Sequence, residues 1–288
     1  MWEKINKFTH SHTILAAFLI GTFFISVLSV FAVFIMYLEG MADAMDTANP
    51  AFLIYFTMVQ IALWIIAIWL MRKMQVFNIN DFKFKNMGKG FFLGWFNIVF
   101  AVGAFFSIFM QIPEGGWITP DPVNLLITVL HPFVGTGMFE EILVRGLILK
   151  ILLLTMGHSK KGIINACIIS SAIFGFAHIV NLIHGTELLS IATQIVYATF
   201  IGVFYAALFL RTKTLWVPIL LHGLTNVSLQ IFNAIVSPDI MQGQAAEDAV
   251  GGVLNILLLT LPFLIAGFIL LRKVTPEDVE LLMVEREG

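Results

Sequence analysis

The sequence predicts an all-α polytopic membrane protein, with about eight transmembrane helices and a functional site inside the helical bundle. Three observations lead to this prediction. Of the 288 residues, 59% are hydrophobic and only 12% are charged, whereas an average soluble domain carries about 25% charged residues. Apolar stretches of the length that crosses a bilayer recur along the chain. The charged residues gather mainly in the connections between those stretches.

Eight apolar stretches are long enough to cross the hydrocarbon core of a bilayer as helices. The connections between them alternate between mainly basic and mainly acidic residues. Because basic residues concentrate on the cytoplasmic side, this alternation predicts an even number of spans with both termini in the cytoplasm. The eight stretches are Thr13–Tyr37, Ala51–Met71, Gly90–Gln111, Leu125–Leu154, Gly162–Val180, Leu188–Leu210, Leu215–Val236 and Ala249–Leu271.

These stretches group into three segments of the chain. Residues 1–123 form an N-terminal membrane region with three transmembrane helices, and residues 124–236 form a core with four. Residues 237–288 hold the last transmembrane helix and a short cytoplasmic tail. In that tail, Thr275 is followed by a proline and two acids, a pattern typical of the start of a helix.

Composition excludes several classes of function. Basic residues are nowhere dense enough for a nucleic-acid partner. Cys167 is the only cysteine, which excludes an intrachain disulfide and a cysteine-rich metal site. The first apolar stretch is too long for the core of a signal peptide. The short connections and the lack of a eukaryotic targeting segment favour a bacterial cell membrane, so the lipid bilayer is the first expected partner.

The segment Met138–Gly146 reads Met-Phe-Glu-Glu-Ile-Leu-Val-Arg-Gly, inside one of the most apolar parts of the chain. Ionised side chains are costly in hydrocarbon, so intramembrane charges mark a functional site that faces protein or water. Glu141 and Arg145 are four residues apart on one helix face, which predicts an ion pair. Glu140 is rotated by about 100° from that face and is free to act as a general base. The alternative is a structural ion pair that locks two helices.

Two later stretches also carry polar residues at helical spacing. His178 and Asn181 are three residues apart, and His222 and Asn226 are four apart, so each pair can share a helix face. A single buried histidine is more often a packing residue than a catalyst, but helices that share a core can pool side chains into one site. His131 lies about two and a half α-helical turns before the acidic pair, and we do not include it in the predicted site.

Together these groups suit the hydrolysis of an amide bond. Glu140 takes a proton from water while His178 orients that water, and the resulting hydroxide attacks a peptide carbonyl. His222 and Asn226 donate hydrogen bonds to the developing oxyanion, and Glu140 then protonates the leaving amine. The second acid, held by its arginine, fixes the helix that presents the base.

Three motifs occur in order in successive membrane segments: Glu-Glu-x-x-x-Arg at 140–145, Phe-x-x-x-His at 174–178 and His-x-x-x-Asn at 222–226. This ordered set resembles the CPBP family, which comprises the CAAX prenyl protease type II and bacteriocin-processing intramembrane proteases and is also called the Abi family. The resemblance covers roughly Asn124 to Val236. It implies an eight-helix, glutamate-dependent intramembrane endopeptidase with residues 124–236 as its catalytic core.

The resemblance also implies the class of substrate, which is a membrane-associated or lipidated protein or peptide. Eukaryotic members trim the last three residues from prenylated proteins. Bacterial relatives are associated with bacteriocin self-immunity and with the processing of leader or pheromone peptides.

Other functions stay open at this point. Intramembrane Glu, His and Arg also build proton relays in transporters, and a non-catalytic immunity or scaffold protein can retain the fold. Glu140, His178 and His222 also provide the His₂Glu set that catalytic zinc uses, so zinc is an alternative. The resemblance itself implies that no metal or other cofactor takes part.

Overall fold

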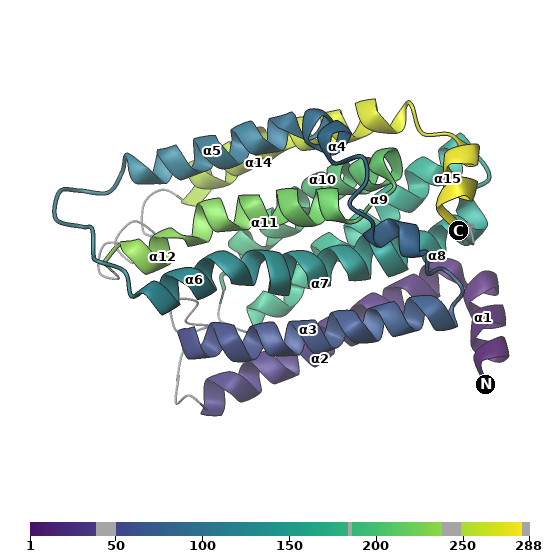
Figure 1. Ribbon diagram of the computed structural model, residues 1–288, viewed down its shortest axis with the longest axis horizontal. Coiled ribbons are helices and arrows are strands. Elements are labelled where there is room, and N and C mark those ends of the chain that lie inside the picture. Colours follow the sequence, from purple (N-terminus) through teal and green to yellow (C-terminus); the bar gives the residue numbers. More distant parts are fainter. Residues whose placement is uncertain (39–49, 184–185, 238–248, 284–288) are drawn as a thin grey trace.

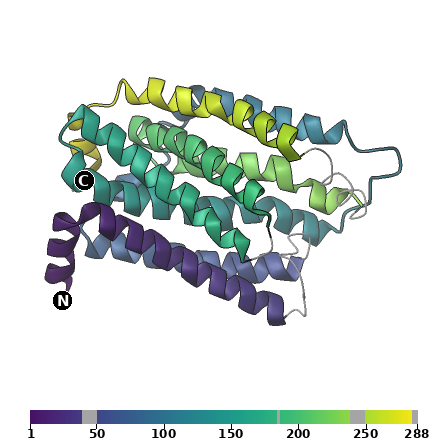
Figure 2. The ribbon, with the colours of Figure 1, turned by 180° about the vertical axis from the view of Figure 1, so that it is seen from behind.

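The computed structural model describes residues 1–38, 50–183, 186–237 and 249–283, which form an elongated bundle of helices (Figures 1 and 2). The α-helices are α1 (Trp2–Ser11), α2 (Thr13–Leu38), α3 (Pro50–Lys73), α4 (Met87–Leu93), α5 (Trp95–Phe109), α6 (Pro122–His131), α7 (Met138–Glu141), α8 (Lys150–Met156), α9 (Lys160–Ala177), α10 (Leu188–Thr212), α11 (Trp216–Gln230), α12 (Phe232–Ile235), α14 (Ala249–Leu271) and α15 (Pro276–Met283).

Four shorter segments have a different hydrogen-bond register. Two are 3-10 helices, η1 (Ile79–Phe82) and η4 (His178–Leu182). Two are π-helices, η2 (Pro132–Gly137) and η3 (Ile142–Leu149), which flank the single turn α7. Residues 238–248 and 284–288 of the predicted C-terminal segment lie outside the described residues.

The predicted class, an all-α polytopic membrane protein, is confirmed. Within the described ranges, five helices are long and apolar enough to cross a membrane, and the pair α4 and α5, bent by 63°, raises the number to six. All eight predicted stretches are mainly helical. However, the fourth changes hydrogen-bond register around α7, and the seventh is divided into α11 and α12, of 15 and 4 residues. The count of eight spans therefore stays a prediction.

The helices are arranged in layers (Figure 1). α2 and α3 pack together along one side of the bundle, and α5 and α14 lie along the opposite side. Between them run the helical stretch from α6 to α8 and the helices α9, α10 and α11. α10 packs against α9 and α14, while α11 packs against α5 and η2. This arrangement encloses the stretch that carries the two adjacent acids.

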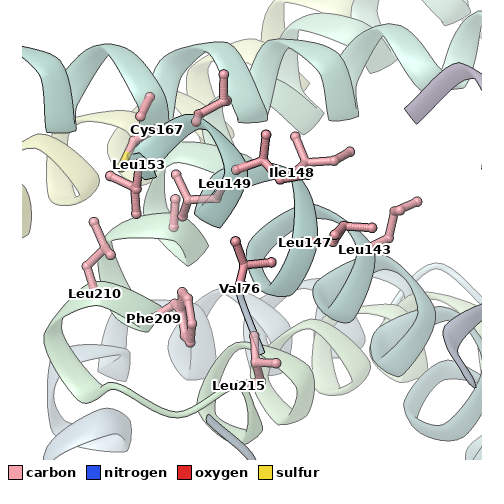
Figure 3. Packing of buried hydrophobic residues seen from close by; sticks show 14 of the residues in the cluster. Val76, Leu143, Leu147, Ile148, Leu149, Leu153, Cys167, Phe209, Leu210 and Leu215 are labelled. Atoms are coloured by element: carbon pink, nitrogen blue, oxygen red, sulfur yellow. The ribbon is translucent and has the colours of Figure 1, made fainter. Parts of the chain in front are cut away.

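That stretch is the centre of the hydrophobic core. Every residue from Glu141 to Lys150 is buried, as in a helix that other helices enclose on all sides. The charged side chains of this segment therefore face protein rather than lipid. Figure 3 shows the apolar part of this packing, in which the labelled residues are Val76, Leu143, Leu147, Ile148, Leu149, Leu153, Cys167, Phe209, Leu210 and Leu215.

The outer helices expose large apolar side chains to their surroundings. Examples are Phe18 and Phe23 on α2, Phe106 on α5, and Leu258 and Leu259 on α14. Contiguous apolar surfaces of this kind are unfavourable in water and suit contact with lipid. The protein is an integral, multi-pass membrane protein.

A buried ion pair, distinct from the predicted pair Glu141–Arg145, joins the loop after α3 to the start of α8. Lys150 Nζ donates hydrogen bonds to Asp81 Oδ2 at 2.5 Å and to the Val76 carbonyl at 2.9 Å, and both charged side chains are buried. Burial raises the pKa of Asp81 to about 6, although the Lys150 ammonium acts in the opposite direction. Neither Asp81 nor Lys150 lines the cavity described below.

The helix predicted in the C-terminal tail is confirmed as α15. The Thr275 N–H donates to Asp278 Oδ2 at 3.1 Å, and the Asp278 N–H donates to Thr275 Oγ1 at 3.3 Å. These reciprocal hydrogen bonds form a capping box, which satisfies two backbone donors at the helix start.

Candidate active site

A cavity of about 1070 Å³ lies within the bundle, and its walls come from α2, α3, α5, α9, α10, α11, α14 and the stretch around α7. Because α7, η4 and α11 each contribute polar side chains, the structure brings residues from three separate parts of the chain to one cavity. Glu141 and Arg145 lie behind the wall rather than on it. The predicted site residues that line the cavity are Glu140, His178, Asn181, His222 and Asn226.

His222 lies between the two adjacent carboxylates. Its Nδ1 is 2.8 Å from Glu141 Oε1, and its Nε2 is 3.6 Å from Glu140 Oε2. Because the carboxylate of Glu141 accepts the first contact, Nδ1 carries the hydrogen and Nε2 faces Glu140. The second distance exceeds a hydrogen bond. The acids thus have different environments: Glu141 is fully buried, whereas the Glu140 side chain is 20% exposed.

The predicted pair between Glu141 and Arg145 is present in the structure. Arg145 Nη1 donates to Glu141 Oε1 at 2.8 Å, and Nη2 donates to the Gly202 carbonyl at 3.1 Å. The guanidinium also lies 5.0 Å from the ring centre of Phe174 and 5.6 Å from that of Tyr205, distances at which aromatic faces attract cations. Sequence spacing identified this pair but did not indicate that the same carboxylate also holds an imidazole.

Close contact between α11 and the π-helical stretch positions that imidazole. A Cβ atom at Gly137 would lie 2.7 Å from the Pro132 carbonyl oxygen and 3.2 Å from that of Ile219 on α11. A Cβ at Gly223 would lie 2.2 Å from the Phe133 ring. Glycine at both positions lets the two backbones approach. The residue before Gly223 can therefore reach the acids on α7.

His178 is at the end of α9, where the chain changes to the 3-10 segment η4. Its Nδ1 is 3.1 Å from the Phe174 carbonyl, which accepts, so Nδ1 carries the hydrogen and Nε2 has the lone pair. Asn181 is one 3-10 turn later, and its Nδ2 donates to Gln194 Oε1 on α10 at 3.0 Å. Asn181 thus connects η4 to α10.

The cavity also contains polar residues that the sequence reasoning missed. His131, which we excluded on α-helical spacing, lines the cavity together with Thr136 and with Gln60 from α3. The reason is the π-helical segment η2, since a π turn holds more residues than an α turn and changes the register between His131 and the acids. In the sequence, the only indication of this part of the site was the presence of these polar residues within apolar stretches.

The described part of the chain contains no group of three His, Cys, Asp or Glu side chains arranged to hold a metal ion. The His₂Glu set named above is thus not assembled as a ligand cluster in these described residues.

Comparison with known proteins agrees with the motifs. No curated protein and no solved structure matches the chain. Residues 122–228 match a family model described as Type II CAAX prenyl endopeptidase Rce1-like. This range begins with α6 and includes all three motifs and every predicted site residue. Over these residues, the chain is similar to the type II CAAX prenyl endopeptidase Rce1-like family, and this match agrees with the family that the ordered motifs predict.

Proposed function

We propose that this membrane protein is a CAAX-type intramembrane endopeptidase in which Glu140 activates the water that cleaves the peptide bond. The observation that carries the proposal is the shared cavity. Glu140, His178, His222 and Asn226 all line it, and Glu140 Oε2 is 3.6 Å from His222 Nε2. A base, two imidazoles and an amide at one cavity provide the groups that amide hydrolysis needs.

The reaction begins with a water molecule between Glu140 and His178. Glu140 accepts one proton of the water, while His178 Nε2, whose partner nitrogen is held by the Phe174 carbonyl at 3.1 Å, accepts the other hydrogen as a hydrogen bond. The hydroxide oxygen forms a bond to the substrate carbonyl carbon. This gives a tetrahedral intermediate with negative charge on the former carbonyl oxygen.

Asn226 and His222 stabilise that oxyanion. Asn226 donates from its amide. His222 donates from Nε2 in its doubly protonated form, which holds its second proton before the substrate enters and keeps it throughout the reaction, while Nδ1 donates to the Glu141 carboxylate 2.8 Å away. Removing one such donor from a hydrolase typically costs about 3–4 kcal/mol of transition-state stabilisation. The C–N bond then breaks, and Glu140 returns its proton to the leaving amine, which restores the carboxylate.

The cavity suits a peptide that carries a lipid chain. Most of its lining side chains are apolar, and many of them come from α2, α5, α10 and α14, so the polar groups occupy only part of the wall. We propose a lipidated or membrane-associated peptide as the substrate, CAAX-type cleavage as the reaction and a bacterial cell membrane with cytoplasmic termini as the setting. Processing of a bacteriocin leader or pheromone peptide uses the same chemistry.

The test is Glu140→Gln, which preserves the shape of the side chain but cannot accept a proton. We expect it to abolish cleavage of a farnesylated CAAX peptide by the purified protein in liposomes. Glu114→Gln, on an exposed connection, is the matched control and should cleave like the wild type. Comparative peptidomics of cells with wild-type protein and with Glu140→Ala then identifies native substrates.

Three results would contradict the proposal. Cleavage by Glu140→Gln at the wild-type rate would show that Glu140 is not the general base. Proton-coupled uptake into liposomes without any cleavage would indicate a transporter. A cellular phenotype, such as immunity, that survives in a Glu140/His178 double variant would indicate a non-catalytic partner protein.

A further inference from the structure

A second polar cluster lies at the wall of the same cavity, where α3 packs against the stretch that precedes Glu140. It consists of Thr57 and Gln60 on α3, His131 at the end of α6 and Thr136 in η2. Gln60 and His131 are 2% and 6% exposed. Gln60, His131 and Thr136 line the cavity, whereas the hydrolytic mechanism uses none of the four residues.

The hydrogen bonds of Thr57 determine which ring nitrogen of His131 carries the hydrogen. Thr57 Oγ1 donates its only hydrogen to the Leu53 carbonyl at 2.6 Å. The contact of 2.8 Å between Thr57 Oγ1 and His131 Nδ1 must therefore have Nδ1 as the donor. A neutral imidazole with its hydrogen on Nδ1 has an acceptor at Nε2.

The other side of His131 leads to Gln60. Thr136 Oγ1 is 3.2 Å from His131 Nε2 and donates to it. Thr136 Oγ1 in turn accepts from Gln60 Nε2 at 3.4 Å. This orients the Gln60 amide, and its carbonyl oxygen Oε1 is left buried without a hydrogen-bond partner in the part of the chain that the structure describes.

A buried acceptor without a donor is unfavourable, because it has lost its hydrogen bond to water without gaining another. The structure makes room for this oxygen, since a Cβ atom at Gly135 would lie 2.4 Å from Gln60 Oε1. The terminal torsion of a glutamine is soft, so Oε1 can turn toward the cavity that the same side chain lines. A ligand with an N–H group would complete the network.

The position of the cluster, part of which lies close to Glu140 along the chain, indicates that the N–H group belongs to the substrate. Thr136 precedes Glu140 by four residues, and both side chains line the cavity. An extended peptide advances about 3.3 Å per residue, so a substrate with its scissile bond at Glu140 can extend along the wall of the cavity that Thr136 and Gln60 line. We propose that Gln60 Oε1 accepts a hydrogen bond from a substrate backbone N–H beside the scissile bond, and that Thr136 and His131 hold Gln60 for this contact.

This inference rests on the proposed function and is tested first by steady-state kinetics. Gln60→Met removes the acceptor at nearly constant volume. With a farnesylated CAAX peptide we expect KM to rise about tenfold, the effect of one hydrogen bond, while kcat changes little. Thr193→Val is the matched control, because Thr193 is also buried but does not line the cavity, and its hydroxyl donates to the Leu189 carbonyl at 2.8 Å. Its KM should not change.

A set of N-methylated peptides tests the contact itself. Each peptide lacks one backbone N–H near the scissile bond. For the wild type, methylation at one position should raise KM about tenfold, and the same peptide should show no such penalty with Gln60→Met. If every methylated peptide has the same penalty in both proteins, Gln60 does not contact the backbone and the inference is wrong.

A binding measurement separates this inference from the proposed function. In the Glu140→Gln background, Gln60→Met should weaken the affinity for a fluorescent farnesylated CAAX peptide about tenfold. The melting temperature of the Glu140→Gln/Gln60→Met double variant should equal or exceed that of the Glu140→Gln parent, because an unpaired buried acceptor is removed. If Glu140→Gln is inactive but Gln60→Met leaves both KM and affinity unchanged, only the backbone contact is refuted. If Glu140→Gln is active, the mechanism fails while the binding result still tests Gln60.

Discussion

Replacement of Glu141 by glutamine tests the arrangement of the site most directly. The Glu141 carboxylate accepts hydrogen bonds at 2.8 Å from both Arg145 Nη1 and His222 Nδ1. A glutamine at this position keeps the shape but loses the charge, and its NH₂ group can donate to Nδ1 of His222. That contact favours the tautomer with its hydrogen on Nε2, and no carboxylate then stabilises the imidazolium.

The expected effects on rate and stability are both large. A neutral His222 with its hydrogen on Nε2 still donates to the oxyanion, but without the positive charge that strengthens this hydrogen bond. Complete loss of one oxyanion donor costs about 10²- to 10³-fold in kcat, so we expect Glu141→Gln to lower kcat by up to about 10²-fold. Breaking one side of a buried ion pair also costs about 3–5 kcal/mol of unfolding free energy, because the Arg145 guanidinium keeps the Gly202 carbonyl but loses its counter-charge.

The assay must separate the loss of rate from the loss of stability. Initial rates with a farnesylated CAAX peptide are measured on protein that elutes as a single folded species, alongside its thermal unfolding. Asp81→Asn is the matched control, since it breaks the other buried ion pair, Asp81–Lys150, which does not line the cavity. It should lose stability but keep the wild-type kcat. A folded Glu141→Gln protein with a kcat close to that of the wild type would refute the proposed role of the carboxylate.

Two further predictions concern α11 and its contact with η2. Asn226→Ala should lower kcat about 10²- to 10³-fold with little change in KM, while Ser228→Ala, whose hydroxyl donates to its own helix at 2.7 Å, should be unaffected; equal rates for both would exclude the oxyanion role. Gly137→Ala brings a Cβ within 3.2 Å of the Ile219 carbonyl and should cost about 1–3 kcal/mol. Gly88→Ala, with open space around it, should not lower the melting temperature, and a similar loss in both variants would contradict the packing argument.

Several features of this protein could be predicted from local sequence because their causes are local. An apolar stretch in a membrane must satisfy its backbone hydrogen bonds internally, so it forms a helix. The start of α15 follows from the capping residues Thr275 and Asp278. The Glu141–Arg145 pair follows from a spacing of four residues on one helix face.

Other features could not be predicted because they depend on how the helices pack. Apolar periodicity does not distinguish an α turn from a π turn, so His131 was placed outside the site although it lines the cavity. The count of eight spans also assumed continuous helices, whereas α4 and α5 are bent by 63°. The neighbour of Gln60 at Thr136 is 76 residues away in the chain.

The membrane class, the helical stretches and the set of chemically competent side chains follow from the amino-acid sequence, because each depends on residues within a few turns of one another. Which of those side chains meet depends on how the helices pack. His222 lies between Glu140 and Glu141 because glycines at 137 and 223 let two helices approach. Such an approach is set by packing between distant segments, and that packing has no periodicity along the chain.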